Sequence, residues 1–507
     1  IRRIMESSTR NVLSGVLVVT LAGGILLSAQ NPGDQYKVYY GLLHAHTAIS
    51  DGSGTPEEAY TMAKEYDLDF FAVTPHNHAA AESGAKDRKD GVLIADNWNL
   101  YNGNTIQTVT QTFSNGSTNE LKVKPLLMAA NEATSPDFLP IYGQEFSTIS
   151  SSNHMNVLGI DEVIRVGDGN VTALVDLLDQ QEEKPILQLN HPDVQSDLFY
   201  EGRSESTKKK MFNDYGIDDG DLGPHFSNMV KKLDPYVHLI EMFSGPAMQK
   251  TRIENYHDDH THHNDYFFYL SQGFHISPTA GQDNHYKTWG MATDIRTGIF
   301  AKSLSRADVF DAFRGQRTFA SEDANARISV SINGAFMGSN LDAEPETSLK
   351  IEIRLDDTDE PDEEVEFAIF GGLVEPQDSR KATNHKQRNN DLTDGTIKTG
   401  ERKIVLEQLT SGNPEFYYVY IRQQDGDRIY SGPVWVNYPK AYAMQDQADV
   451  DATAQAYVWT KSKSSEVYHL EGCPSTRMIK DANRVSGVTP PEGRRLHECP
   501  VDEEGEH

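Results

Sequence analysis

Short apolar runs alternate with amphipathic stretches between residues 36 and 325, and most of the runs end at a histidine or an acidic residue. Short runs of this kind are typical of buried strands, and the stretches between them are typical of helices. The pattern therefore predicts an α/β fold built as a βα-type barrel or a layered sheet. The strands are expected at residues 39–43, 70–74, 140–144, 185–190, 237–240 and 275–282.

The first run delivers two histidines, His44 and His46, and Asp51 follows them closely. Alternate residues of a strand point to the same face, so both imidazoles aim at one point. Two neutral imidazoles with a carboxylate nearby suit a divalent transition metal better than a packed core. The pair alone is weak evidence, because His-x-His also occurs on solvated strands.

A helix is expected directly after this segment. Thr55 is a suitable N-cap, Pro56 suits the first helical position, and Glu57 and Glu58 suit the first turn.

The later runs end in the same kinds of residue: His76, Glu145, His191, Glu241, and finally Asp283 with His285. A further histidine, His154, follows Glu145 within a few residues. In βα barrels the functional groups gather at the C-terminal ends of the strands, so these side chains should meet in one place. Such a cluster costs too much free energy to bury unless cations hold it together.

In this order the motifs resemble those of the PHP-domain metallohydrolases, the polymerase and histidinol phosphatase family, over residues 36–325. The resemblance implies a distorted (β/α)7 barrel with two or three divalent ions, and the ligand types allow Zn, Mn or Fe. All nine metal-ligand positions of the family are filled, by His44, His46, Asp51, His76, Glu145, His154, His191, Asp283 and His285.

One motif departs from the family pattern, because Pro75 stands where relatives usually have Asp before the histidine. Pro75 cannot supply the carboxylate that would orient the imidazole of His76. His78 could compensate for this loss or replace His76.

Within the family, residues 281–285, 296–300 and 311–320 look similar to the carbaryl-hydrolase branch, the CehA/McbA-type proteins. Members of that branch hydrolyse phosphate esters or carbamate esters, so the resemblance does not settle which bond is cut.

The resemblance implies hydrolysis by a metal-bound hydroxide, since clustered ions lower the pKa of a bridging water from ~15.7 towards ~7. The leaving group would take its proton from His78, Asp193 or His191. Glu145, His191, Asp283 and His78 are thus the expected catalytic residues. Glu145 is expected to bridge two ions, with His44, His46 and Asp283 on one, His154 and His191 on the second, and Asp51, His76 and His285 on a third.

These expectations favour a metal-dependent phosphoesterase acting on a small phosphomonoester or phosphodiester. One alternative is a carbamate or carboxylic ester hydrolase of the carbaryl-hydrolase type. The other is a non-catalytic PHP-like binding or scaffold protein with structural metals. The complete ligand set favours catalysis, because a structural site needs only one closed four-ligand ion.

Two other polar segments are interpreted as exposed surface in preference to functional sites. The histidine-rich run at residues 257–263 lacks strand-tip register, so a surface or lid segment is favoured over a metal site. Arg203 and the lysines at 208–210 are expected to be solvent-exposed, with contact to an anionic substrate as the alternative.

After residue 325 the pattern changes to strict alternation at residues 328–332 and 349–355 and to aromatic-rich runs at 365–370 and 417–422. This predicts an antiparallel β-sandwich over residues 326–440. A packing role is the default for it, and carbohydrate binding is the alternative.

Residues 441–507 form a small tail module that holds Cys473 and Cys499. A disulfide, a zinc site that includes nearby histidines, and free thiols all stay open for these cysteines.

Residues 1–30 combine basic residues, an apolar stretch and small residues, which is the pattern of a secretory signal peptide. An uncleaved anchor helix is the alternative, although the apolar stretch is short for a span. The expectation is an exported protein, periplasmic or extracellular, without a membrane span in the mature chain.

The whole chain of 507 residues has room for two or three domains. Its formal net charge of -30 argues against a nucleic-acid partner. The expected partner is therefore a small phosphate-ester or carbamate substrate, and the oligomeric state stays open.

Overall fold

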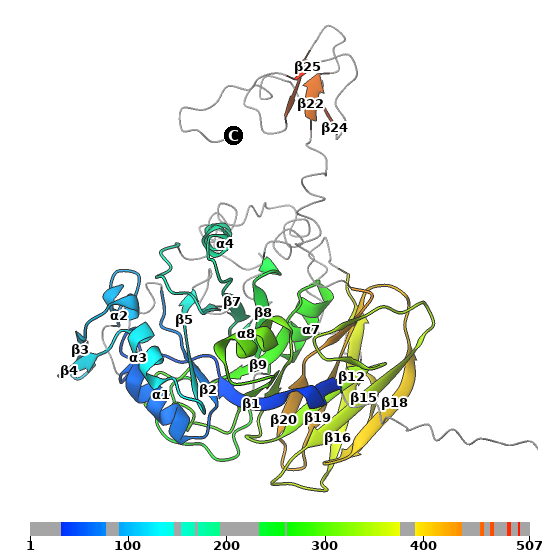
Figure 1. Cartoon of the computed structure of the whole chain (residues 1–507), viewed down its shortest axis with the longest axis horizontal. Coiled ribbons are helices and arrows are strands. Elements are labelled where there is room, and N and C mark those ends of the chain that lie inside the picture. Colours follow the sequence, from blue (N-terminus) through cyan, green and yellow to red (C-terminus); the bar gives the residue numbers. More distant parts are fainter. Residues whose placement is uncertain are drawn as a thin grey trace, which may run out of the picture.

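The computed structural model describes residues 32–77, 91–146, 154–167, 171–192, 233–258, 261–375 and 391–438, together with four short strands of the tail. These residues form a mixed α/β fold in which one long, curled sheet carries most of the strands. Figure 1 shows α1, α2 and α3 at one end and β12, β15 and β18 at the other. The predicted signal peptide, His78, Asp193, Arg203, residues 208–210 and both cysteines lie outside the described residues.

The part of the long sheet that comes from the first half of the chain runs in the order β1-β2-β5-β6-β7-β8-β9. Neighbouring strands are parallel except at β6, which is antiparallel to both β5 and β7. Beyond β1 and β9, Ala45 and Asn284 form a parallel bridge, so the two ends of this series meet. The bounds are β1 Lys37–Leu42, β2 Phe70–Val73, β5 Leu139–Phe146, β6 Met155–Leu158, β7 Ile186–Leu189, β8 Val237–Ser244 and β9 Ser277–Gly281.

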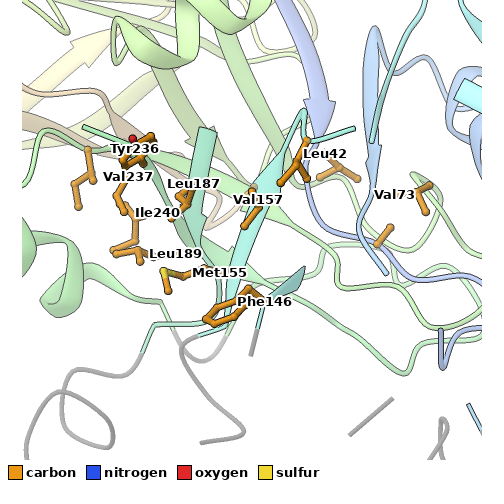
Figure 2. Close-up of a cluster of buried hydrophobic side chains, with 14 of the residues drawn as sticks. Leu42, Val73, Phe146, Met155, Val157, Leu187, Leu189, Tyr236, Val237 and Ile240 are labelled. Carbon is orange, nitrogen blue, oxygen red and sulfur yellow. The ribbon is translucent and has the colours of Figure 1, made fainter. Parts of the chain in front are cut away.

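Both faces of these strands are largely buried, as the apolar runs predict, except along the first four residues of β1. Along β2, Phe71 and Val73 join the larger hydrophobic cluster, whereas Phe70 and Ala72 join a smaller one. Figure 2 shows part of the larger cluster, with labelled side chains from Leu42 on β1 to Ile240 on β8. Successive residues of a strand point to opposite faces, so a run that is apolar throughout can fill two cores.

Helices are few among the described residues, and they cover the strands at a small number of places. The apolar side of α8 packs into the smaller cluster through Val309, Phe310 and Phe313. The buried aromatic residues of α7 include Tyr266, whose ring lies 4.8 Å from that of Tyr418. The bounds are α1 Pro56–Glu65, α2 Asn99–Asn102, α3 Leu126–Ala133, α4 Val171–Asp179, α7 His263–Ser271 and α8 Arg306–Arg314, with a 3-10 turn η1 at Pro32–Gln35 and a hairpin of β3 Gln107–Thr112 and β4 Thr118–Val123.

The long sheet continues without a break into the C-terminal half of the chain. From β1 it passes through β10, β11, β20, β19 and β21 to β14, and β16 pairs with β19 and β17. The pairing of β11 with β20 crosses residue 325, where the sequence pattern changes. The bounds are β10 Arg296–Ala301, β11 Thr318–Ser321, β14 Asn340–Leu341, β16 Glu364–Leu373, β17 Asp391–Lys398, β19 Glu415–Arg422, β20 Arg428–Ser431 and β21 Val434–Val436.

A separate four-stranded antiparallel sheet, in the order β13-β12-β15-β18, packs against this C-terminal part of the long sheet. Ile328 and Ile353 from the small sheet share one hydrophobic cluster with Phe367 and Ile421 from the long sheet. The bounds are β12 Arg327–Ile332, β13 Ala335–Phe336, β15 Ser348–Asp356 and β18 Arg402–Leu409. The domain limits predicted from the sequence stay predictions.

The described part of the tail is a small sheet in the order β24-β22-β23-β25. Its strands are β22 Tyr457–Thr460, β23 Val467–Leu470, β24 Arg484–Gly487 and β25 Arg495–Leu496. Across the whole set of described residues, no helix combines the length and the apolar character needed to cross a membrane.

Helix α1 begins as its sequence predicts. The Thr55 hydroxyl accepts a hydrogen bond from the Glu58 backbone N–H at 3.2 Å, and the Glu58 carboxylate accepts one from the Thr55 N–H at 2.9 Å. This reciprocal arrangement satisfies two backbone donors that the first turn would leave unpaired. The cap also fixes the end of the segment that carries Asp51.

Replacing Thr55 by Ala should lower the free energy of unfolding by about 1 kcal/mol, because the cap hydroxyl is lost. Urea unfolding followed by circular dichroism measures the change. Thr61→Ala is the matched control, since Thr61 lies exposed in the same helix and its hydroxyl donates to the Glu57 carbonyl one turn earlier. Equal stabilities of the two variants would contradict the role of the cap.

Candidate metal centre

The histidines and acids at the strand ends converge at one edge of the curled sheet. His44 and His46 follow β1, His76 follows β2, Glu145 is the penultimate residue of β5, and His191 follows β7. Asp283 and His285 follow β9, and Asp51 lies between β1 and α1. All eight are therefore brought to the carboxyl ends of strands that run in the same direction.

His154 reaches this edge from the opposite direction. It stands immediately before β6, which is antiparallel to its neighbours, so the start of β6 lies beside the ends of β5 and β7. The His154 carbonyl accepts a hydrogen bond from the Asn190 N–H at 2.9 Å, which ties it to the end of β7. The sequence predicts the proximity of His154 but not the reversal of its strand.

Backbone hydrogen bonds fix the segments that carry these side chains. The His46 N–H donates to the Asn284 carbonyl at 2.8 Å, and the Asp283 N–H donates to the His44 carbonyl at 3.1 Å. The Glu145 N–H donates to the Pro75 carbonyl at 3.0 Å. Pro75 differs from the family pattern, but this hydrogen bond to its carbonyl still holds the segment in place. The neighbouring His76 therefore lies in the cluster, where it is 7% exposed.

The carboxylate of Glu145 lies at the centre of the cluster and is fully buried. Its Oε1 is 3.1 Å from His44 Nε2, 3.1 Å from His154 Nδ1 and 3.3 Å from His191 Nε2. Its Oε2 is 2.8 Å from His76 Nδ1 and 3.2 Å from His46 Nε2. One carboxylate thus faces five imidazoles.

Three groups of side chains in the cluster have atoms close enough together to share an ion. Glu145 belongs to two of the groups, which suits a residue that bridges two ions. His46 and His76 are each shared as well, whereas the sequence assigned each of them to a single ion. The groups are His44 with His46, Glu145 and Asp283; His76 with Glu145 and His154; and His46 with Asp51, His76 and His285.

His191 contacts Glu145 but falls in none of these groups, although the sequence paired it with His154 on one ion. Its side chain is 23% exposed and that of Asp283 is 17% exposed, more than any other member of the cluster. Both residues have positive φ angles, 28° for His191 and 47° for Asp283, which non-glycine residues seldom adopt. The cluster therefore opens to solvent at His191 and Asp283.

The charges in the cluster stabilise one another. Burial opposes the charged form of Glu145, but His44, His76 and His154 hold the pKa of its carboxyl well below the usual value. Burial also opposes charge on His285, but Asp51 and Asp283 raise its pKa to about 10. Nearby carboxylates likewise hold the pKa of His44 above its usual value, so without a cation they favour the protonated forms of His44 and His285.

The donor set fits divalent cations. Glu145 Oε2 and Asp51 Oδ1 are buried and accept no hydrogen bond within the described residues, although ring nitrogens lie close to both. The Nε2 atoms of His44 and His46 are 3.3 Å apart, so a proton or a cation is needed between them. These oxygen and nitrogen atoms face one another without forming donor–acceptor pairs. Metal ligands have the same arrangement, because each of them points a lone pair at the ion. Imidazole and carboxylate together suit Zn, Mn or Fe.

The sequence-based ligand set leaves out Glu241, which is fully buried on β8. Its Oε1 lies 2.8 Å from His44 Nδ1, and its Oε2 accepts the His191 backbone N–H at 2.8 Å. A carboxylate that accepts a hydrogen bond from one ring nitrogen of an imidazole fixes the tautomer. The other ring nitrogen then becomes a better metal ligand. The signal was present in the sequence, since the apolar run 237–240 ends at Glu241 as other runs end at predicted ligands.

Two further features hold Glu145 and Glu241 in position. Asn190 donates to Glu145 Oε1 at 3.0 Å, and its own amide oxygen accepts from Gln188 at 3.0 Å. A Cβ atom on Gly281 would lie 2.1 Å from Glu241 Oε1 and 2.9 Å from His44 Cβ. Only glycine leaves room there for the Glu241 carboxylate.

The histidine-rich run at residues 257–263 divides among different neighbours. His257 lies 3.2 Å from Asp427, and Asp258 accepts the Ser244 N–H at 3.0 Å. His263 is 2.7 Å from the Tyr418 hydroxyl, and burial lowers the pKa of His263 to about 4. The described part of the run is therefore neither a single metal site nor a plain surface segment.

No protein-family model matches the chain, and no curated protein matches it. Among solved structures, it is similar to a two-domain protein from Bacteroides vulgatus ATCC 8482 that contains a predicted PHP-like metal-dependent phosphoesterase. The two are 13% identical with a TM-score of 0.37, over 78% of this chain and 92% of that one. The PmoD soluble domain from Methylocystis sp. ATCC 49242 (Rockwell) matches at 8% identity and a TM-score of 0.13, over 22% of this chain and 90% of that one. Likenesses this distant do not assign an activity to the chain.

Replacing Glu241 by Gln should weaken metal binding about 10- to 100-fold, because the imidazole of His44 loses its negative partner. Calorimetric titration of the metal-free protein with Zn²⁺ or Mn²⁺ measures the affinity. Glu65→Gln, on the exposed side of α1, is the matched control and should bind as the unchanged protein does. An unaltered affinity in Glu241→Gln would show that Glu241 has no influence on the ions.

Metal binding near neutral pH should release protons and should strengthen as the pH rises. His285 has a pKa of about 10 in the folded protein without metal, against about 6.5 for a free imidazole, and a metal ligand must be neutral. Between these two values the metal has to displace a proton, so its affinity increases with pH. Calorimetry in two buffers of different ionisation enthalpy counts the protons. An affinity that is constant across this interval would contradict the protonated state of the free cluster.

Proposed function

We propose that the chain is a metal-dependent hydrolase whose substrate is a small phosphate ester. The observation that carries this proposal is the position of Glu145, a fully buried carboxylate that faces five imidazoles and belongs to two ion-sized groups. A structural metal needs one closed set of four ligands. In this cluster Glu145, His46 and His76 are each shared between two groups. The cluster is also open to solvent at His191 and Asp283. Both features suit a catalytic site better than a structural one.

Ions held by these residues would lower the pKa of a bound water and withdraw charge from the ester oxygens. The chain's own part is to hold and orient that centre and to move protons beside it. Glu241 orients His44 through a hydrogen bond to its Nδ1, and Asn190 orients Glu145 by donating to its Oε1. His191, the most exposed imidazole of the cluster, is the described candidate for giving the leaving group its proton.

The charge balance of the cluster favours an anionic substrate. Asp51, Glu145, Glu241 and Asp283 together carry four negative charges, which two divalent ions would neutralise. A third ion would leave a surplus of two positive charges beside neutral imidazoles. A phosphate ester matches that surplus, whereas a carbamate ester is uncharged.

We further propose that residues 36–325 form a distorted (β/α)7 barrel of the PHP type, close to the carbaryl-hydrolase branch. The nine filled motif positions support the family, and the bridge between Ala45 and Asn284 supports a barrel that closes. The shared cluster of two facing sheets supports a β-sandwich over residues 326–440. Export by a signal peptide at residues 1–30 stays part of the same proposal.

Replacing Glu145 by Gln tests the central claim. The substitution keeps the shape of the side chain but removes the charge that bridges the ions, so turnover should fall about 100-fold or more. The assay measures release of the aryl group from a phosphomonoester, a phosphodiester and a naphthyl carbamate, with Mn²⁺ or Zn²⁺ supplied. Circular dichroism shows whether the variant is still folded.

Glu65→Gln, which removes the same charge at an exposed position, should leave turnover unchanged. Unchanged turnover in a folded Glu145→Gln variant would rule out the bridging role. Hydrolysis of the carbamate alone would replace the phosphoesterase proposal with the carbaryl-hydrolase one. No turnover of any substrate by metal-loaded protein would favour a binding or scaffold role.

A further inference from the structure

Asp283 lies between two buried amide side chains, those of Gln282 and Asn284, which contact a different part of the molecule. Asp283 Oδ1 is 2.9 Å from His46 Nε2, inside the cluster. The amides of Gln282 and Asn284 instead bond the loop of residues 286–295, which precedes β10 and is named the support loop. The support loop is therefore bonded to the residues on both sides of Asp283.

The amide of Gln282 joins two points of the support loop. Its Nε2 donates to the Thr293 carbonyl at 3.1 Å and to the Thr293 hydroxyl at 3.0 Å. Its Oε1 accepts a hydrogen bond from the Gly290 N–H at 3.2 Å. Buried backbone groups outside helices and strands need partners, and the fully buried Gln282 supplies them to this loop.

Arg296, the first residue of β10, holds the same loop from its other end. Its guanidinium donates to the carbonyls of Ile295 at 2.8 Å, Thr293 at 3.1 Å and Gly290 at 3.4 Å. Gly290 and Thr293 are therefore each bonded by both Gln282 and Arg296.

The position of Arg296 is costly for a charged side chain. The residue is 5% exposed, and burial lowers the pKa of its guanidinium to about 10. Within the part of the chain that the structure describes, no carboxylate forms an ion pair with Arg296. A buried charge without an opposite charge is unfavourable unless its hydrogen bonds compensate. Such a cost favours a role for Arg296 beyond the stability of the fold.

The support loop also holds the first motif of the cluster. The indole N–H of Trp289, which is fully buried, donates to the His46 carbonyl at 3.0 Å. His46 and Asp283 belong to one ion-sized group, together with His44 and Glu145. The group of His76, Glu145 and His154 includes neither of them. The contacts of the loop therefore concern one part of the cluster in particular.

We infer that Gln282 and Arg296 are positioning residues for the ion that Asp283 binds. They act through the support loop, which fixes the backbone on both sides of Asp283 and the carbonyl of His46. Asp283 has a positive φ angle of 47°, so its backbone needs such support. The inference rests on the metal centre of the proposed function, and it concerns residues outside the ligand set.

The test compares metal binding by the whole unchanged protein and by Gln282→Met. Methionine has a similar length but cannot make the hydrogen bonds of the amide to the support loop. Loss of a residue that orients a ligand weakens metal binding about 10- to 100-fold, so the ion at Asp283 should bind more weakly by that factor. The ion at His154 should keep its affinity. Competition of Zn²⁺ with a chromophoric chelator measures the successive affinities.

Two further variants complete the comparison. Arg296→Lys keeps the charge but loses the planar pair of donors, so it should show the same selective loss. It replaces Gln282→Met if that variant does not fold. Gln423→Met is the matched control, because Gln423 is 3% exposed and its amide bonds Asp357 and Glu360 at 2.9 Å, in the C-terminal half. The control should lower the melting temperature but leave every metal affinity unchanged.

Unchanged affinities in folded Gln282→Met and Arg296→Lys would overturn the inference. So would an equal loss at every ion, because a general loosening of the fold produces that result. A selective loss, in a protein whose unchanged form hydrolyses none of the esters, would support the inference and reject the proposed function. Absence of metal binding by the unchanged protein would reject both.

Discussion

A buried, charged carboxylate at Glu145 needs positive charge or hydrogen-bond donors on several sides, because an isolated charge is very costly in a protein interior. The structure meets this need with five imidazoles and the amide of Asn190. Those imidazoles are buried in their turn, so they need the carboxylates of Asp51, Glu241 and Asp283. The result is a set of groups in which none is stable alone, and whose arrangement is compatible with bound metal ions.

This requirement explains features of the fold that would otherwise be unfavourable. His191 and Asp283 have positive φ angles, and Gly281 is packed against Glu241 so closely that no side chain fits. Backbone bridges join Ala45 to Asn284 and His76 to Glu145, between segments distant in sequence. Each of these arrangements places a member of the cluster or a residue that contacts it, and the apolar clusters on both faces of the strands stabilise the scaffold around it.

The C-terminal strands are part of the same framework, since β11 pairs with β20 and the long sheet passes from one half of the chain to the other. Helix α7 reinforces this junction through aromatic contacts such as that of Tyr266 with Tyr418. The C-terminal half therefore supports the strands that hold the imidazole centre.

By itself, the sequence determined several of the strands, those made of apolar runs, and the residue types that stand at their ends. The apolar runs before His44, His76, Glu145 and His191 all became strands, and the cap of α1 forms as its residues predict. These are local features, because they follow from the periodicity of side chains along a strand and from hydrogen bonds between near neighbours.

Only the tertiary structure decided how those strand ends combine. Because β6 is antiparallel to its neighbours, His154 lies beside the ends of β5 and β7. The pairing of distant strands brings Glu241 against Nδ1 of His44 and leaves His191 at the solvent-exposed edge of the cluster. The grouping of ligands likewise differs from the sequence-based one, with His46 and His76 each shared between two groups. Such choices depend on strand direction and on distances between residues far apart in the chain. No periodicity within a single segment encodes them.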